Sequence, residues 1–346
     1  PDESRALLKT ILQRPRVKSA SLRCRFDDSA RKGFQQRTLS LVHLVRYRAV
    51  CPLYSSLILF PSIMIQRRTV GIVGTGHVGT AAAYALFNQS IAPRLLLLDA
   101  DHERAEGEAM DLMHGQMLVG RVTCEAVDYE GMRDAQVIVI AAGAGQADAS
   151  ETRLDLLKRN ASIFQQIITE LDRHAPNAIL IVATNPVDVL TYISQELSDR
   201  PNERIIGTGT LLDTARFRAL LGQHYNVDPR SVHAYILGEH GDSEVPIWSN
   251  AMIGGQPIYG RTALGRSWDE EAMQHLFEQA RNAAYRIIQK KGYTNTAIGV
   301  VIARIVRAIL DDQQSVLPIS SRPDGAYGID DVCLSTPCTV GIEGVG

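Results

Sequence analysis

From Thr69 onward, the hydrophobic and polar positions form two alternating patterns along the chain. Short continuous apolar runs are typical of strands buried on both faces, and longer segments rich in helix-forming residues separate them. We expect strands in the segments TVGIVG, RLLLLD, AQVIVIAAG and NAILIVATN, and helices over 78–89, 102–114 and about 153–174. Strands that alternate with helices in this way predict an α/β fold with a doubly wound parallel sheet.

From about Leu211 the segments become longer and more mixed. This change predicts a second, α+β domain that carries helices and antiparallel strands. We therefore expect the parallel sheet to form one domain over residues 66–210 and the mixed segments to form a second domain over residues 211–346. Residues 1–65 form a separate basic segment that we expect to be disordered or not native.

Residues 1–65 are rich in Arg and Ser, with 12 Lys and Arg against 4 Asp and Glu. They resemble a transit-peptide-like arm in composition, or they are an added or upstream-translated segment. The second interpretation is favoured because the chain opens with Pro1, while Met64 directly precedes the first good strand. No function is assigned to this segment.

The composition is that of an ordinary globular protein large enough for two domains: 346 residues, 45% hydrophobic and 21% charged. The net charge is −2, and since residues 1–65 carry +8, the remainder carries −10. This remainder offers no electrostatic argument for nucleic acid. No apolar run reaches the roughly 18–20 residues of a membrane span.

The five cysteines are few and odd in number, and they show no metal-ligand spacing. Neither a disulfide framework nor a zinc site is indicated, and no metal is expected. Their pattern favours a reducing, cytoplasmic location.

The segment GTGHVG at 74–79 has the GxGxxG spacing of a phosphate-binding turn. It follows a predicted strand and opens a predicted helix, which is the context that dinucleotide binding requires. Gly74 permits the tight turn, Gly76 lets the backbone approach a pyrophosphate, and Gly79 allows helix and strand to pack closely. Val78 fills the turn beside His77, which we expect to be simply exposed.

Asp99 ends the second predicted strand, twenty residues after Gly79. A carboxylate here accepts hydrogen bonds from the ribose diol of a bound dinucleotide, and its charge repels a 2′-phosphate. Alone, Asp99 is equally a solvated acid at the end of a strand. Together with the glycine spacing it predicts NAD as the cofactor, in preference to NADP.

The segment GEHGD places His240 among glycines and acids, where the ring has little side-chain cover. A lone histidine near a strand end is more commonly a hydrogen-bonded boundary residue. An imidazole with an ordinary pKa of about 6.5 is also suited to carrying a proton in both directions at neutral pH.

Six segments occur in the order found in one family: GIVGTGHVG, ETRLDLLKRN, ATNPVDVLTY, GTLLDTARFR, GEHGDSEVP and KGYTNTAIG. With them the chain resembles the lactate/malate dehydrogenase family from about Arg68 to its last residue, and most closely the L-lactate branch. The resemblance implies an NAD-binding Rossmann domain, a catalytic domain and usually a homotetramer.

The same resemblance implies roles for four polar side chains. His240 corresponds to the proton carrier, and Asp213 to the acid that orients its ring and favours imidazolium. Arg216 corresponds to the residue that grips the substrate carboxylate through a guanidinium fork, to which lysine is a poor alternative. Arg153 corresponds to the mobile-loop arginine that polarises the reacting carbonyl.

Further ligand contacts follow from the same matching. For the substrate they are Gln146, Arg153, Asn185, Arg216 and Thr294. For the cofactor they are Gly74, Gly76, Val78, Gly79, Asp99, Arg104, Tyr129, Gly143, Ala144, Ala183, Asn185 and Thr208. Of these, Arg104 and Tyr129 are equally well explained as solvated side chains.

The segment AGAGQADASETR at 142–153 bears on the choice between lactate and malate. Malate enzymes of the family carry an early arginine here for the second carboxylate of their substrate. This segment has none before Arg153, and Gln146 stands where lactate enzymes have glutamine, which favours pyruvate and L-lactate. Six residues separate Gln146 from Arg153, one more than the family pattern, so the register of Gln146 stays open.

Arg218 and His233 match the positions at which bacterial L-lactate dehydrogenases bind fructose 1,6-bisphosphate across a subunit interface. Arg218 lies two residues after Arg216, about 200° around a helix, and so points away from the catalytic pocket. Without the resemblance, a helix-surface arginine and a strand histidine have no special meaning.

Two other functions stay open: a malate or other 2-hydroxyacid dehydrogenase of the same fold, and a catalytically silent NAD-binding relative. Relative to the family pattern, the end at TVGIEGVG lacks a final strand and a long amphipathic helix, so a C-terminally truncated catalytic domain is expected.

Overall fold

The computed structural model describes residues 68–145 and 153–346, and of Arg153 only the backbone. Residues 1–65 and Gln146, for which predictions were made above, lie outside the described residues. By internal contacts, Arg67–Gly346 forms one compact unit, separate from Pro1–Gln66. The description below concerns this unit.

Six parallel strands form the first half of the sheet, in the order β3-β2-β1-β4-β5-β6. Their bounds are β1 Thr69–Val73, β2 Arg94–Leu98, β3 Thr123–Ala126, β4 Val137–Ile140, β5 Ile179–Val182 and β6 Ile205–Gly207. Every residue of β1, β4 and β5 is buried, which is why these strands read as continuous apolar runs. The predicted doubly wound parallel sheet is confirmed.

Five helices connect these strands: α2 His77–Asn88, α3 His102–His114, α4 Gln116–Val119, α5 Arg153–His174 and α6 Val187–Leu197. The bounds predicted for α3 and α5 agree with the structure. α3 begins where Asp101 caps it, since the Asp101 side chain accepts a hydrogen bond from the Arg104 amide.

The chain beyond β6 is mainly helical, with α7 Leu211–Tyr225, α8 Glu270–Arg281, α9 Ala283–Lys291 and α10 Thr296–Leu310. Short strands lie between α7 and α8: β7 Val232–His233, β8 Ile236–Leu237, β9 Val245–Pro246, β10 Met252–Ile253 and β11 Gln256–Pro257. The predicted antiparallel pairing is found in β8 with β9, and in β10 with β7 and β11.

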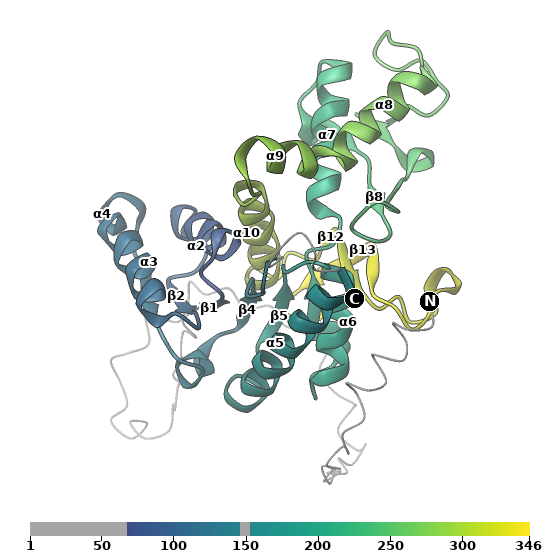
Figure 1. Cartoon of the computed structure of the whole chain (residues 1–346). Coiled ribbons are helices and arrows are strands. Elements are labelled where there is room, and N and C mark those ends of the chain that lie inside the picture. Colours follow the sequence, from purple (N-terminus) through teal and green to yellow (C-terminus); the bar gives the residue numbers. More distant parts are fainter. Residues whose placement is uncertain (1–67, 146–152) are drawn as a thin grey trace, which may run out of the picture. The chain divides into compact units, whose positions relative to one another are not determined.

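The last strands return to the parallel sheet and extend it to nine strands. They are β12 Ser315–Ser321, β13 Leu334–Gly341 and β14 Gly344–Val345, and β12 pairs antiparallel with β6 through Ser320 and Gly207. Figure 1 shows α10 lying beside α2, while α7, α8 and α9 group together. The C-terminal segment therefore shares both the sheet and the core of the segment that forms the six parallel strands.

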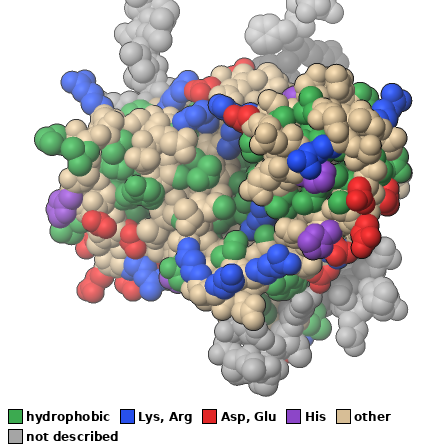
Figure 2. All heavy atoms as spheres, turned by 90° about the horizontal axis from the view of Figure 1, so that it is seen from above, with side chains coloured by type: hydrophobic (Ala, Val, Ile, Leu, Met, Phe, Trp, Pro, Cys, Tyr) green, Lys and Arg blue, Asp and Glu red, His purple; other side chains and the backbone are tan. Residues whose placement is uncertain are grey.

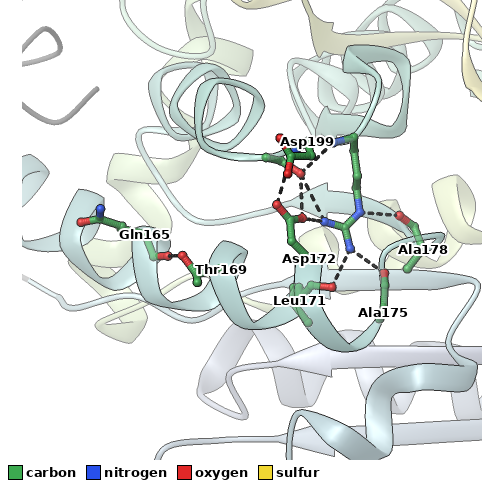
Figure 3. Close-up of polar contacts among 9 residues, drawn as sticks. Gln165, Thr169, Leu171, Asp172, Ala175, Ala178 and Asp199 are labelled. Carbon is green, nitrogen blue, oxygen red and sulfur yellow. Dashed lines mark hydrogen bonds and ion pairs between the residues drawn. The ribbon is translucent and has the colours of Figure 1, made fainter. Parts of the chain in front are cut away.

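A buried arginine closes the C-terminal end of α5. Arg200 is 7% exposed, and its guanidinium donates to the carbonyl oxygens of Leu171 at 2.9 Å and Ala178 at 3.1 Å, as well as to Ala175 and to the Asp172 carboxylate. Figure 3 shows the carbonyl groups converging on it. Leu171 lies in the last turn of α5, whereas Ala175 and Ala178 lie in the segment that follows it. The arginine therefore ties the end of the helix to that segment, with its positive charge at the negative end of the helix dipole.

Among the residues described, no helix combines the length and apolar character needed to cross a membrane.

Candidate active site

The glycine turn between β1 and α2 has room for a ligand only on its outer side. Gly74 has a φ of +94°, and a Cβ there would lie 2.4 Å from the Ala142 nitrogen. A Cβ at Gly79 would lie 1.8 Å from the Gly74 carbonyl oxygen, whereas one at Gly76 would meet nothing within 4 Å. Gly76 caps α2 without any side-chain hydrogen bond. The first amides of α2 thus face an open approach, which fits a pyrophosphate.

Asp99 stands at the end of β2, against the same turn. Its Oδ2 accepts from the Thr75 amide at 2.6 Å and from the Thr75 hydroxyl at 2.9 Å, and its Oδ1 accepts from the Asp101 amide at 3.0 Å. Burial alone would raise the pKa of Asp99, but these hydrogen bonds and nearby Arg104 outweigh it and lower the pKa. The carboxylate is therefore held ionised, which suits an acceptor for ribose hydroxyls.

Side-chain hydrogen bonds tie together the ends of β4 and β5. Asn160 of α5 is 1% exposed, and its Oδ1 accepts from the Ala144 amide at 2.7 Å. Thr184 donates to the Ala142 carbonyl at 2.7 Å, and a Cβ at Gly143 would lie 2.5 Å from its Cγ2. The predicted contacts Gly143 and Ala144 are thus held beside the segment that follows β5.

The other predicted contacts that follow these strands lie on the same edge. Ala183 directly follows β5, its amide donating to Ile140, and Thr208 directly follows β6, its amide donating to Val182. Asn185 is exposed and precedes Pro186 through a cis peptide bond. Because the carboxyl ends of parallel strands share one edge, this row lies beside the glycine turn.

The His240 ring contacts the carboxylate of Asp213, which lies in the first turn of α7. Nδ1 of His240 lies 2.6 Å from Oδ2 of Asp213, and the two side chains are 24% and 3% exposed. Burial alone would lower the pKa of His240, but the hydrogen bond and charge of Asp213 outweigh it and raise the pKa. The carboxylate fixes the ring orientation and leaves Nε2 to meet another group.

The backbone of His240 is held from α6. Its amide donates to Oδ2 of Asp188 at 2.8 Å, and the Ser320 hydroxyl of β12 donates to the other oxygen. Asp188 lies three residues after Asn185, so this bond brings His240 to the carboxyl edge of the parallel strands. Burial raises the pKa of Asp188, opposed by its hydrogen bonds to Ser320 and His240.

Arg216 lies one turn after Asp213 and shares its carboxylate. Nη1 of Arg216 donates to Oδ1 of Asp213 at 2.9 Å, and the arginine side chain is 14% exposed. Its other nitrogens make no hydrogen bond with a described residue. A half-buried guanidinium with free donors beside an imidazole can bind a small carboxylate.

Glu244 is the third carboxyl group of this cluster. It is 5% exposed, and its Oε1 has no hydrogen-bond partner among the described residues. Burial, reinforced by the charge of Asp213, raises the pKa of Glu244 to about 8. Asp213, His240 and Glu244 place ligand atoms within 4.8 Å of one another, as a metal ion needs. However, His240 and Asp213 are hydrogen-bonded to each other, and a carboxyl held neutral is a poor ligand.

Four other predicted residues are placed by their elements alone. Arg153 begins α5, but its side chain is not described. Thr294 lies in the loop between α9 and α10, and Arg104 lies in the first turn of α3. Tyr129 follows β3 and is half-buried, with its pKa raised by burial and by Glu170.

Arg218 and His233 lie on neighbouring elements. Nε of Arg218 donates to the Ala234 carbonyl at 2.9 Å, and its guanidinium lies 4.9 Å from the Tyr235 ring centroid. His233 precedes Ala234 in the chain and is exposed. The structure thus brings the α7 arginine to the strand that carries the histidine.

Sequence reasoning missed Asn160, Asp188 and Glu244 as supports of this site. Each is polar and nearly inaccessible to solvent. A polar residue that interrupts the apolar face of a predicted helix is the signal that marks Asn160 and Asp188.

On the face seen in Figure 2, Lys and Arg side chains are scattered, with a short row near the lower edge, and acidic side chains gather mainly toward the left and right.

The two halves of the chain match two family descriptions. Residues 68–207 match "lactate/malate dehydrogenase, NAD binding domain" and residues 210–346 match "lactate/malate dehydrogenase, alpha/beta C-terminal domain". The chain belongs to the lactate/malate dehydrogenase family, and its first matched domain is one that binds NAD.

Among similar proteins, the L-lactate dehydrogenase of Salinibacter ruber is 76% identical over 282 residues, covering 82% of this chain and 89% of that protein. The L-lactate dehydrogenase of Priestia megaterium is 47% identical over 81% of this chain and 88% of its own length. The crystal structure of the minor L-lactate dehydrogenase of Enterococcus mundtii, in its ligand-bound form, superimposes with a TM-score of 0.79 at 45% identity, covering 81% of this chain and 90% of that one.

Proposed function

We propose that this protein is an NAD-dependent L-lactate dehydrogenase that interconverts pyruvate and L-lactate. One observation carries the proposal: Asp213 links the His240 imidazole to the Arg216 guanidinium, and the His240 amide donates to Asp188, three residues after the predicted contact Asn185. The L-lactate dehydrogenases to which the chain is similar support the same activity.

His240 is assigned the proton transfer. In pyruvate reduction the imidazolium gives its Nε2 proton to the ketone oxygen, and in lactate oxidation the neutral ring takes the hydroxyl proton. Asp213 stabilises the imidazolium, in agreement with the raised pKa of His240. Bound NADH supplies the hydride for C2 of pyruvate.

Arg216 is assigned the substrate carboxylate, through the nitrogens that are not bonded to Asp213. Asn185 and Thr294 are assigned to the walls of the substrate site. Arg153 and Gln146 are assigned to the loop that closes over the substrate, Arg153 polarising the ketone.

For NAD, the turn Gly74, Gly76, Val78 and Gly79 is assigned the pyrophosphate, and Asp99 the adenosine ribose. Arg104 and Tyr129 are assigned contacts near the adenosine. The row after β4, β5 and β6 is assigned the nicotinamide half: Gly143, Ala144, Ala183, Asn185 and Thr208. The open space at Gly76, where a Cβ would meet nothing within 4 Å, supports this arrangement.

The reaction is tested by following NADH oxidation with pyruvate or with oxaloacetate, in the wild type and in His240→Asn. We expect faster turnover of pyruvate, because no arginine precedes Arg153 in its segment to pair a second substrate carboxylate. Faster turnover of oxaloacetate would reassign the enzyme to malate. Full activity in His240→Asn would remove the proton-transfer role.

The proximity of Arg218 and His233 supports activation by fructose 1,6-bisphosphate, a ligand with two phosphates. Two such pairs around a two-fold axis would concentrate positive charge for it. Pyruvate saturation curves with and without the sugar bisphosphate test this proposal. Curves that superimpose end it.

We also assign the enzyme to a homotetramer in the cytoplasm, with neither nucleic acid nor membrane as a partner. Exposed apolar side chains support association: Met117 is 90%, Leu118 81% and Met110 61% exposed. A groove of about 340 Å³ lies beside them, between α2, α3 and α4. Apolar surface of this kind typically marks a protein interface.

The described cysteines are free and buried, in agreement with a reducing compartment.

A further inference from the structure

Two aromatic rings join the phosphate-binding turn to the loop before α10. The rings of His77 and Tyr293 are stacked, with centroids 3.8 Å apart and an interplanar angle of 1°. His77 is the first residue of α2, inside the GxGxxG turn, and Tyr293 precedes Thr294. Both residues are exposed, so burial in a core does not explain the contact.

The stack lies at the N-terminal ends of two closely packed helices, α2 and α10. A Cβ on Gly299 of α10 would lie 2.6 Å from the Ala81 carbonyl oxygen of α2, so the two backbones touch. The chain runs from His77 to Ala81 in α2, and from Tyr293 to Gly299 in and before α10. Both helices therefore lead from the stack toward the backbone contact, so α2 and α10 are parallel and their N-termini lie side by side. The backbone contact of Gly299 with Ala81 lies about one turn of α2 after His77, so the stacked rings join the N-terminal ends of the two helices.

The Tyr293 loop is itself braced. Nζ of Lys291 lies 4.8 Å from the Tyr293 ring centroid and donates to Oδ1 of Asn295 at 2.6 Å. Thr296 donates to the same oxygen at 3.1 Å. These contacts make the loop internally rigid, and the Tyr293 ring joins it to His77. The position of Thr294 in this loop therefore depends on the position of His77.

We propose that His77 and Tyr293 are positioning residues that couple the dinucleotide site to the substrate site. When the pyrophosphate fixes the glycine turn, the stack fixes the Thr294 loop, and the enzyme–NADH complex binds the keto acid more tightly. Coupling of this kind is reciprocal between the two ligands. The inference rests on the proposed function, in which the turn binds NAD and Thr294 borders the substrate.

The test measures pyruvate KM and kcat at saturating NADH, together with the Kd of oxamate, a non-reducible pyruvate analogue, for the enzyme–NADH complex. The variants are His77→Ala and Tyr293→Leu, which remove one ring, and His77→Phe, which keeps a ring. Tyr327→Leu replaces an exposed tyrosine outside the stack and serves as control.

We expect His77→Ala and Tyr293→Leu each to raise pyruvate KM and oxamate Kd about fivefold, with kcat within twofold, on the scale of one aromatic pair. The double variant should be no worse than either single one, and His77→Phe should stay within twofold of wild type. A change below twofold in both single variants overturns the proposal. So does a His77→Phe variant as weak as His77→Ala, because the imidazole nitrogens would then matter and the stack would not.

Oxamate binding separates this outcome from failure of the proposed function. An enzyme that does not reduce pyruvate contradicts the activity, while unchanged oxamate affinity in active variants contradicts only the stack.

Discussion

Asp213 bonds His240 through one carboxylate oxygen and Arg216 through the other, with Oδ2 lying 2.6 Å from Nδ1 of His240 and Oδ1 lying 2.9 Å from Nη1 of Arg216. A single buried acid thus sets the orientation of both the proton carrier and the carboxylate-binding group. Its removal is expected to affect both functions, in different kinetic parameters.

Asp213→Asn should move the pH profile of pyruvate reduction to lower pH. The acid raises the pKa of His240, and reduction needs the imidazolium, so activity is present below that pKa and is lost as the pH rises through it. Without the carboxylate charge, the alkaline limb of kcat/KM should fall earlier. An unshifted alkaline limb would mean that another group controls the profile.

His240→Asn should lower kcat by about 10²–10⁴-fold, the usual contribution of a positioned acid–base group. The measurement is kcat for pyruvate reduction at saturating NADH, with intrinsic NADH affinity as the control. Because His240 is held by its backbone amide, which donates to Asp188 of α6, the substitution should leave NADH binding unchanged.

Arg216→Lys should raise pyruvate KM and lower kcat/KM by about 10–100-fold, since a charge-assisted hydrogen bond contributes about 1.5–3 kcal/mol. Lysine keeps the charge but has no planar fork to bind two carboxylate oxygens. Arg230→Lys, at a side chain that is 90% exposed, is the matched control. Equal losses in both variants would rule out a specific carboxylate contact.

The sheet could be predicted from the sequence because β4 and β5 are buried on both faces. Every position in these strands must then be apolar, as at Val137 and Ile179, which gives a continuous apolar run. It also predicted that α3 starts at His102, since Asp101 supplies a local cap. Both signals lie within a few residues of the element they define.

The residues that hold the site in place contact partners far away in the sequence. Asp188 contacts the His240 amide across 52 residues of chain and Ser320 across 132. Partners so distant are set by the tertiary fold, and no spacing within one segment reveals them. For the same reason nothing in the sequence indicated that His77, which is exposed as expected, stacks its ring on Tyr293.

Glu244→Gln should stabilise the protein, increasingly as the pH rises. The folded pKa is about 8 against an ordinary value of 4.5. Between these values the unfolded chain releases the proton that the folded protein keeps, so wild-type stability falls as pH rises through this window. Glutamine does not titrate, so the variant avoids this fall of a few kcal/mol in the free energy of unfolding.

Urea unfolding of wild type and Glu244→Gln at pH 5 and pH 8 measures this effect. Glu271→Gln, at an exposed position of α8, is the control and should show no pH-dependent gain. A constant difference between wild type and Glu244→Gln at both pH values would show that Glu244 titrates normally.

Arg200→Ala should lower the free energy of unfolding by about 3–5 kcal/mol, because it removes the buried ion pair with Asp172 and one donor from each of three carbonyl oxygens. Urea unfolding tests this against Arg230→Ala, whose exposed side chain should contribute within about 0.5 kcal/mol. Similar losses in the two variants would contradict a structural role for the cluster in Figure 3.

The double variant Met117→Lys/Leu118→Lys should dissociate the proposed oligomer without unfolding the subunit. Both side chains are more than four-fifths exposed, so charge there costs little within one chain, but it is costly where two apolar surfaces meet. Light scattering after size exclusion should show a lower mass, with the circular dichroism spectrum unchanged. Ile342→Lys, at a half-exposed apolar residue, is the control and should keep the wild-type mass. If the double variant also keeps that mass, the surface formed by α4 does not hold the subunits together, and the interface must lie elsewhere on the molecule.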